Sequence, residues 1–366
     1  MNGKNSSDKV FITDCEGPIS KNDNAFELAN HFIPDGDKLF SILSKFDDVL
    51  AEIIRKPDYK KGSTLKFILP FLRAYGATDE KIRKYSLKNV VLVPGAKQTL
   101  QFIKNIMPTF IVSTSYEPYI DALCQHLCFS LKNTYSTKMS IDKYPLDQEE
   151  INKLRNIRDE IKSFDRIRIP NDARCLEDLP QKSIKTIEKL EKIFWEIIPD
   201  LESEKMLDDV NPIGGVEKAK AVEDISEREE VNLEDIMYIG DSITDVEAFR
   251  FLGEGGGLSI SFNGSVYAVQ NAEIAVLAEN SIIISILADY FNRFGKEGVF
   301  ELIDNWSYKT LEKLYPNEKL LSQVSDLYPE ELPRVDVINE ENERELIEKS
   351  IKFRKGLRGE AIGELG

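Results

Sequence analysis

The sequence predicts an α/β protein built around a doubly wound parallel sheet. Two short apolar runs, residues 10–13 and 236–239, are each followed closely by an aspartate and a glycine. A third apolar run, residues 109–113, ends in hydroxyl side chains. Buried parallel strands form such near-continuous apolar runs. Because ligands of open α/β sheets bind at the carboxyl ends of the strands, the three runs also predict where the site lies.

Acidic residues follow the runs at 10–13 and 236–239. Asp14 and Glu16 come directly after the first run, with Gly17 beside them. Asp241 and Asp245 follow the second run, and Asp241 lies 227 residues after Asp14. Carboxylate oxygens are the preferred ligands of hard divalent cations such as Mg²⁺, and an aspartate can also act as a nucleophile. The two loops therefore predict a magnesium site with a nucleophilic carboxylate.

The remaining elements alternate in an order typical of an α/β core with helical insertions. Breakers such as Pro34-Asp35-Gly36 and Lys61-Gly62-Ser63 divide the segment after the first strand into helices. Strands are predicted at residues 10–13, 90–93, 109–113, 236–239, 258–262 and 273–277. Helices are predicted at 25–32, 38–55, 65–75, 79–87, up to 104 after Pro94-Gly95, and at 119–129, 246–252, 281–294, 296–306, 311–315, 318–327 and 340–354.

The composition disfavours several classes of function. The net charge is −16, from 64 acidic and 48 basic residues, which disfavours binding to nucleic acid or to an anionic membrane surface. His31 and His126 are the only histidines, so zinc centres and histidine-based triads are poorly supplied. With 366 residues, 42% of them hydrophobic, the chain can bury a full core and more than one domain.

The cysteines and the apolar segments predict a cytoplasmic protein. The four cysteines include no Cys-x-x-Cys pair, which favours a reducing setting. Residues 1–9 are polar, so we expect no signal peptide. The longest apolar run, residues 282–288, falls short of the roughly 20 residues that a membrane span needs.

The order and spacing of the motifs resemble the haloacid dehalogenase (HAD) superfamily, and within it the phosphoserine phosphatase-like, Mg²⁺-dependent phosphatases. That family begins with a strand ending in Asp-x-Asp-Gly and closes its site with Gly-Asp-x-x-x-Asp, which Asp14-Cys15-Glu16-Gly17 and residues 240–245 resemble. The resemblance implies a Rossmann-like core with a helical C1-type cap. Residues 1–20, 88–141 and 210–295 would form the core, 21–87 the cap, 142–209 a charged helical insertion, and 296–366 a C-terminal helical extension with a loose tail from 356 onward. The insertion is a second cap, a partner-binding arm or a solvated helical hairpin.

The resemblance also implies roles for individual residues. Asp14 would attack phosphorus and form an aspartyl-phosphate, and Glu16 would serve as acid and then base. Lys218, with Lys220 as the second choice, would neutralise Asp14 and the phosphate. The expected cofactor, Mg²⁺, would be held by Asp14, the backbone carbonyl of Glu16 and Asp241, with Asp245 as a further ligand or as the group that orients a metal-bound water. Phosphate and substrate contacts are assigned to Ser113, Thr114, Gly17, Lys218 and Asp23.

Several of these residues have simpler explanations in terms of structure. In phosphoserine phosphatase-like proteins an acidic residue at the position of Asp23 reaches the substrate's amino group. Asp23 is also suited to be the N-cap of the first helix in the cap domain, and we favour this structural role. Ser113 is compatible with an ordinary helix N-cap, and Lys218 with a solvated lysine of a charged helix. Arg55, Lys56, Lys60 and Lys61 form a basic cluster that either attracts an anionic substrate or is merely solvated.

Glu16 is the main departure from the family pattern, which usually has Asp at this position. The glutamate carboxyl lies one C–C bond, about 1.5 Å, further from the backbone. A misplacement of about 1 Å can cost a catalytic group on the order of 10²-fold in rate. Either the loop adapts to the longer side chain, or Glu16 is a poor acid and base.

The predicted function is hydrolysis of a small phosphorylated metabolite, with two alternatives. One is a phosphotransferase or mutase that uses the same aspartyl-phosphate. The other is an accessory or regulatory subunit, because residues 14–27 also resemble archaeal HAD-like proteins of methanogens labelled subunit R of the energy-converting hydrogenase A. That label would imply association with a membrane hydrogenase complex, although the sequence has no iron–sulfur cysteine spacing. We expect no nucleic-acid partner and no direct membrane insertion, and a protein partner would bind through 142–209 or the C-terminal helix.

Overall fold

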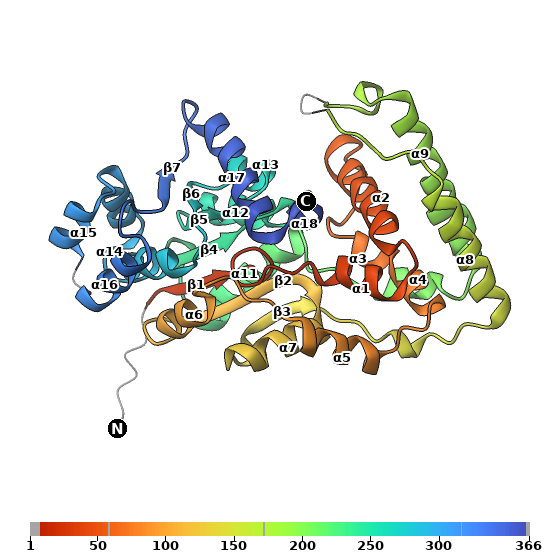
Figure 1. Cartoon of the computed structure of the whole chain (residues 1–366), viewed down its shortest axis with the longest axis horizontal. Coiled ribbons are helices and arrows are strands. Elements are labelled where there is room, and N and C mark those ends of the chain that lie inside the picture. The colour runs from red at the N-terminus through yellow and green to blue at the C-terminus, as the bar shows by residue number, and fades with distance from the viewer. Residues whose placement is uncertain (1–7, 58, 171–172, 316, 364–366) are drawn as a thin grey trace.

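The computed structural model is organised around one seven-stranded sheet and describes residues 8–57, 59–170, 173–315 and 317–363 (Figure 1). The strand order is β3-β2-β1-β4-β5-β6-β7, with β1 between β2 and β4. All neighbouring pairs are parallel except β6 and β7. The strands are β1 Val10–Thr13, β2 Thr109–Tyr116, β3 Thr134–Thr137, β4 Ile236–Gly240, β5 Leu258–Phe262, β6 Ile274–Leu277 and β7 Arg334–Val337.

Helices cover both faces of the sheet, which makes the core doubly wound. Successive side chains of β1 alternate between the faces: Phe11 packs in one hydrophobic cluster with α6, α7 and α14, whereas Val10 and Ile12 pack in another with α11 and α12. The core helices are α6 Ala96–Lys104, α7 Glu117–Leu127, α11 Val216–Glu229, α12 Val246–Glu254, α13 Val266–Asn271 and α14 Ile282–Asp304. Short 3₁₀ helices lie at Leu131–Asn133, Leu233–Asp235 and Ile243–Asp245.

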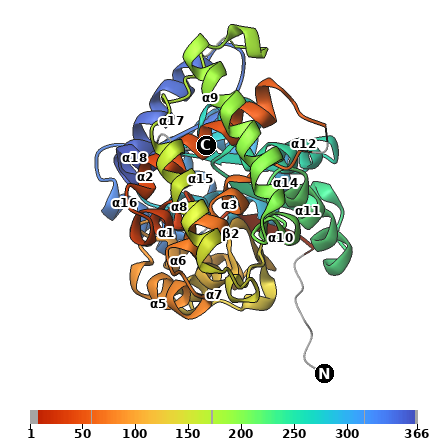
Figure 2. The same ribbon diagram turned by 90° about the vertical axis from the view of Figure 1, so that its right-hand side faces the viewer.

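A helical cap adjoins the carboxyl ends of the strands, on the right of Figure 1. One hydrophobic core unites residues from two separate segments, 25–82 and 141–210. α8 and α9 cover the outer side of this cap (Figures 1 and 2). The charged insertion thus packs against the first cap segment. The cap helices are α1 Asn24–Phe32, α2 Gly36–Asp48, α3 Thr64–Phe67, α4 Leu69–Ala74, α5 Asp79–Asn89, α8 Gln148–Lys162, α9 Gln181–Lys192 and α10 Glu204–Asp209, with π-helical turns at Val49–Ile53 and Ile193–Ile197 and 3₁₀ turns at Ile141–Lys143, Leu176–Asp178 and Ile198–Asp200.

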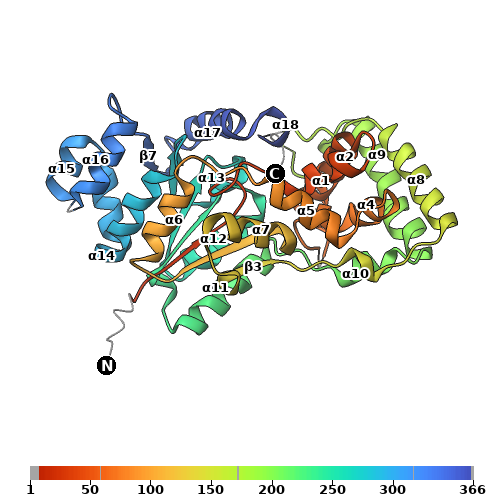
Figure 3. The ribbon, with the colours of Figure 1, turned by 60° about the horizontal axis from the view of Figure 1, so that its bottom comes forward.

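The C-terminal part returns to the core and then crosses toward the cap. α14 breaks at Gly295, whose φ of 70° is not helical, at the point where the sequence predicts a boundary. After α15 Tyr308–Leu314, α16 Glu318–Leu327 and β7, the last helices are α17 Glu343–Arg358 and α18 Glu360–Gly363. Figure 3 shows α17 and α18 running from the β7 side toward α1 and α2.

Some predicted elements are wrong. Residues 90–93 do not form a strand of the sheet, because their backbone pairs with the segment that leads into the cap: Lys21 N donates to Val91 O and Val93 N to Ile19 O, each at 2.8 Å. The edge strands β3 and β7 were not predicted. The expected loose tail is also wrong for residues 356–363, which continue α17 and form α18. Residues 364–366 of that tail and residues 1–7 of the polar N-terminus lie outside the described residues. Within the described part of the chain, no helix is long and apolar enough to cross a membrane.

Candidate active site

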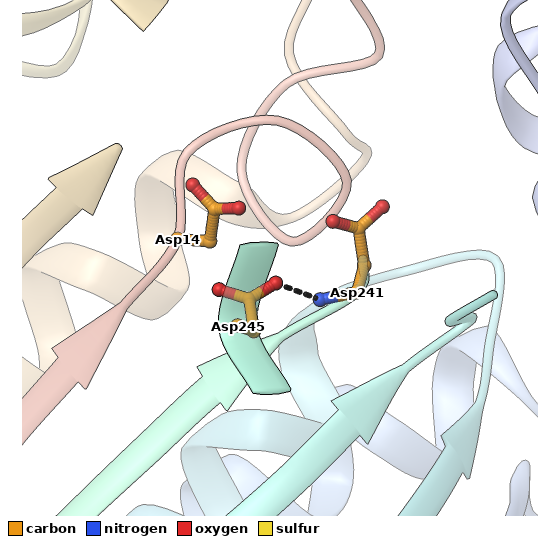
Figure 4. Close-up of side chains that lie close together, drawn as sticks. All are labelled: Asp14, Asp241 and Asp245. Carbon is orange, nitrogen blue, oxygen red and sulfur yellow. Dashed lines mark hydrogen bonds between the residues drawn. The ribbon is translucent and has the colours of Figure 1, made fainter. Parts of the chain in front are cut away.

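Three aspartates meet where β1 and β4 end (Figure 4). Asp14 follows β1, while Asp241 and Asp245 lie in the loop and 3₁₀ turn after β4. Each has one carboxylate oxygen within 4.8 Å of those of the other two, and all three side chains are buried. This set of hard oxygen donors fits a divalent cation such as Mg²⁺. The side chain of Glu16 does not belong to the cluster.

Lys218 joins two of these aspartates. It projects from the first turn of α11, and its side chain is 0% exposed. Its Nζ lies 2.7 Å from Asp14 Oδ2 and 2.7 Å from Asp245 Oδ1. Burial alone would lower the pKa of Lys218, but the two carboxylates raise it above its usual value, so the lysine is cationic. The second choice, Lys220, is 62% exposed and pairs with Glu217, which places it outside the site.

Asp245 accepts hydrogen bonds from five donors, among them the Ser242 hydroxyl at 3.3 Å, and organises the loop after β4. Its Oδ2 accepts the backbone N–H groups of Asp241 and Ser242, each at 3.0 Å. Its Oδ1 accepts Lys218 and the Tyr238 hydroxyl, the latter at 2.8 Å. Of the two roles expected for Asp245, this favours orientation of the site over direct ligation, because each of its oxygens already accepts two or more hydrogen bonds.

Gly17 lets the loop after β1 approach Asp241 closely. Its φ is +100°, and a Cβ built there would lie 2.3 Å from Asp241 Cγ. No other residue type fits without displacing the carboxylate. Gly17 therefore shapes the aspartate cluster, and it is not among the residues that line the cavity described below.

Asp14 sits at the centre of these contacts. Its Oδ1 accepts the Cys15 N–H at 2.6 Å, and its Oδ2 accepts Lys218. Burial raises the pKa of the Asp14 carboxyl to about 7, an effect that Lys218 opposes. A cation bound at the cluster would add further positive charge and favour the ionised form.

Glu16 uses its longer side chain to reach the cap. Its Oε1 accepts the Asn24 N–H at 2.8 Å, at the start of α1, and the Ser115 hydroxyl at 2.7 Å. Burial, with Asp23 adding to the effect, raises the pKa of Glu16 to about 8, while Arg358 opposes the shift. Glu16 is therefore positioned as a protonated acid near neutral pH.

The remaining predicted residues, Ser113, Thr114 and Asp23, line the same region, and Asp23 also has a structural role. Ser113 and Thr114, in the second half of β2, border the cavity beside Asp14. The Ser113 hydroxyl accepts the Ser115 N–H at 3.2 Å, and Thr114 donates to the Thr244 hydroxyl at 3.3 Å. Asp23 accepts the Phe26 N–H at 3.0 Å and so caps α1, as favoured from the sequence, although it also borders the cavity.

A family model described as haloacid dehalogenase-like hydrolase matches residues 97–286, more than half of the chain. The chain belongs to this family. The match includes Ser113, Lys218 and Asp241 and begins after Asp14.

Solved structures resemble this haloacid dehalogenase-like hydrolase to different extents. The gene product AF1437 from Archaeoglobus fulgidus is 25% identical, has a TM-score of 0.79 and matches over 98% of this chain and 99% of that one. Phosphoserine phosphatase in its apo form gives 15% identity and a TM-score of 0.42 over 75% and 96% of the two chains. A phospho-aspartyl intermediate analogue of phosphoserine phosphatase gives 16% and 0.45 over the same shares. None of the curated proteins compared with the chain matches it.

Two arginines of this hydrolase were missed in the sequence. Arg354 Nη1 donates to the carboxylate of Asp241 and, at 3.0 Å, to its backbone carbonyl. Arg358 Nη1 donates to the same carboxylate oxygen at 3.1 Å. Both side chains are 4% exposed. Their spacing of four residues on a charged helix resembles an ordinary solvated face, so no local signal distinguishes them.

A cavity of about 110 Å³ lies between the core and the cap of the hydrolase. Its walls combine residues of the cluster with cap residues and both arginines. The lining includes Asp14, Glu16, Ser113, Thr114 and Asp241 from the core, Phe40, Asp47 and Leu65 from the cap, and Arg354 and Arg358 from α17. The volume suits a phosphate-sized group rather than a whole metabolite, for which pockets of about 300–1,000 Å³ are usual.

Proposed function

We propose that the chain is a Mg²⁺-dependent phosphomonoester hydrolase that acts on a small phosphorylated metabolite through an aspartyl-phosphate on Asp14. The observation that carries the proposal is the buried contact of Lys218 with Asp14 and Asp245, next to Asp241 and the hydroxyls in the second half of β2. Such a site offers a carboxylate nucleophile, a fixed positive charge and hydroxyl donors within reach of one phosphoryl group.

In the first step an Asp14 oxygen forms a bond to phosphorus, and the bond from phosphorus to the ester oxygen breaks. Glu16 gives its proton to that oxygen, and the alcohol leaves. Lys218 balances charge on Asp14 and the phosphoryl oxygens, and the hydroxyls of Ser113 and Thr114 donate hydrogen bonds to them.

In the second step Glu16, now a carboxylate, takes a proton from water as the water oxygen attacks the phosphorus of the aspartyl-phosphate. The bond from phosphorus to Asp14 breaks, which releases inorganic phosphate and restores the free carboxylate. A divalent cation held by Asp14, Asp241 and the Glu16 carbonyl would supply positive charge to the phosphoryl oxygens. Cap residues such as Phe40 and Leu65 form part of the cavity wall, which limits the access of bulk water to this chemistry.

The test is phosphate release from a panel of small phosphomonoesters, with and without Mg²⁺. We expect metal-dependent turnover that falls about 10³-fold or more in Asp14→Asn, because the nucleophile is lost. Asp304→Asn, an exposed change at the end of α14, is the control and keeps wild-type activity. An added alcohol acceptor separates hydrolysis from phosphotransfer by its products. A folded wild-type protein that releases no phosphate from any ester contradicts the proposal.

A further inference from the structure

The C-terminal helix contacts the core and the active site along a single face. Ser350 Oγ donates to Gly264 O at 2.7 Å, in the loop after β5. Arg354 and Arg358, four and eight residues further, both reach Asp241. Residues at this spacing share one side of an α-helix. α17 therefore lies with one polar face directed into the site, and we refer to α17 and α18 together as the C-terminal strap.

The strap continues from the site to the cap. Arg358 also donates to the carbonyl oxygens of Lys21, at 3.2 Å, and Asn22, at 2.5 Å. These residues directly precede the cap helix α1. Ile362 in α18 then packs against the hydrophobic core of the cap. The docked strap thus joins core, aspartate cluster and cap entry, as the path of α17 and α18 in Figure 3 indicates.

The two arginines supply at Asp241 the positive charge that a divalent cation would otherwise supply. Asp14, Asp241 and Asp245 carry three formal negative charges, and Lys218, Arg354 and Arg358 carry three positive ones. The three aspartates of the cluster are therefore matched by three cations before any metal binds, and the carboxyl of Asp23 also lies near both arginines. A divalent cation that binds alone would add two positive charges beside the two arginines in a buried site, which is unfavourable. A phosphate dianion arriving with the cation would cancel the charge that the cation adds.

We propose that the C-terminal strap competes with the divalent cation for Asp241, so that the cation binds tightly only together with a phosphoryl group or after the strap has moved away. The small volume of the cavity, about 110 Å³, agrees with a docked strap that leaves no room for a whole metabolite. The strap would then act as a built-in gate that links metal entry to substrate entry. This inference rests on the proposed function only in taking Asp241 as a metal ligand.

The first experiment measures Mg²⁺ binding calorimetrically, with no phosphate present, to the full-length wild type and to Arg354→Met/Arg358→Met. Methionine keeps much of the apolar stem of arginine and removes its charge. We expect the double variant to bind Mg²⁺ about tenfold or more tightly, because two buried positive charges are gone. The matched control is Arg344→Met/Lys352→Met, which removes two charges from exposed positions on the same helix and should bind as the wild type does.

The same titration in inorganic phosphate tests the charge argument. Wild-type affinity for Mg²⁺ should rise with phosphate, and the double variant should gain less. A folded double variant that binds Mg²⁺ no more tightly than the wild type overturns the proposal. Weaker binding also overturns it, and would make the arginines positioning residues that orient Asp241.

A second measurement uses the wild type alone and does not depend on the variant folding. Amide hydrogen exchange of residues 343–363 should become faster when Mg²⁺ alone is added at saturating concentration, since without a phosphoryl group the cation must displace the strap from Asp241. Unchanged or slower exchange in a protein that has bound Mg²⁺ overturns the strap. Because both readouts measure binding, a chain that behaves as predicted yet hydrolyses no ester contradicts only the proposed function, whereas an active chain without competition contradicts only the strap.

Discussion

Lys218 Nζ lies 2.7 Å from Asp14 Oδ2, although the two residues are 204 positions apart in the chain. The lysine is fully buried and touches a second carboxylate, Asp245, at the same distance. One side chain therefore holds the loop after β1 against the turn after β4. Its role is structural as well as electrostatic, because without it two buried carboxylates face each other.

Lys218→Met should destabilise the protein by about 3–5 kcal/mol, the usual cost of removing one partner from a buried ion pair. Urea unfolding followed by circular dichroism measures this, and phosphate release should be lost as well. Lys220→Met, on the exposed side of the same helix, should change stability by no more than about 0.5 kcal/mol. Equal effects of the two substitutions would contradict the role given to Lys218.

Glu16→Asp should lower phosphatase turnover, although it restores the residue usual in the family. The shorter side chain cannot keep the contacts of Glu16 with Asn24 N and Ser115 Oγ, because its carboxyl lies about 1.5 Å closer to the backbone. We expect a fall of about 10–100-fold in kcat/KM, measured by phosphate release at saturating Mg²⁺. A rise in turnover would mean that Glu16 is a compromised acid in this site.

Gly17→Ala should distort the aspartate cluster, because its Cβ would overlap the carboxylate of Asp241. Calorimetry should show weaker Mg²⁺ binding in phosphate buffer, along with reduced turnover. Gly256→Ala is a close control: its φ of +80° carries a similar backbone penalty, but the nearest atom, Glu234 Cβ, is 3.6 Å away. If both variants bind Mg²⁺ equally well, the close packing of Gly17 on Asp241 does not contribute to Mg²⁺ binding.

Asp47 should make stability depend on pH in the acidic range. Burial raises the pKa of Asp47 to about 6, against hydrogen bonds from Thr64 and Tyr59. Between its ordinary pKa of 3.8 and about 6 the folded state binds more protons than the unfolded chain, so the free energy of unfolding falls as pH rises through this window. The loss is on the order of 3 kcal/mol.

Asp47→Asn should remove that slope. Urea unfolding at several pH values between 4 and 7 gives the free energy of unfolding of the wild type and of the variant. As pH rises, the wild type should lose stability relative to the variant. Asp304→Asn, an exposed change, should track the wild type throughout. A constant difference across the window would show that Asp47 titrates normally.

The fold and much of the site could be predicted because each apolar run is local and ends at a recognisable residue. Asp14 and Asp241 follow buried parallel strands and Ser113 lies in the second half of a third, so the geometry of the sheet alone brings them together. Lys218 could be selected only by resemblance, since its neighbourhood in the sequence matches that of Lys220. The family and the α/β core are confirmed. A hydrogenase association and partner binding through 142–209 or the C-terminal helix stay predictions.

The errors have a common physical cause, which is tertiary contact between distant segments. Residues 90–93 are apolar enough for a strand but pair with the cap entry near Lys21. The tail after Gly356 has no local signal for burial, yet Arg358 is fixed by Asp241, Lys21 and Asn22. Short edge strands such as β3 are polar and half-buried, so their pattern is too weak to distinguish them from loops.

The position of β1 in the interior of the sheet has a consequence for how the protein folds. Phe11 pairs with Thr109 on one side, and Val10 pairs with Ile236 on the other. Both edges of β1 thus stay unpaired until segments about 100 and 230 residues away have been brought together. Contacts of such long sequence separation form slowly, and unpaired strand edges promote association between chains. Dilute conditions during refolding should therefore favour recovery of the native protein.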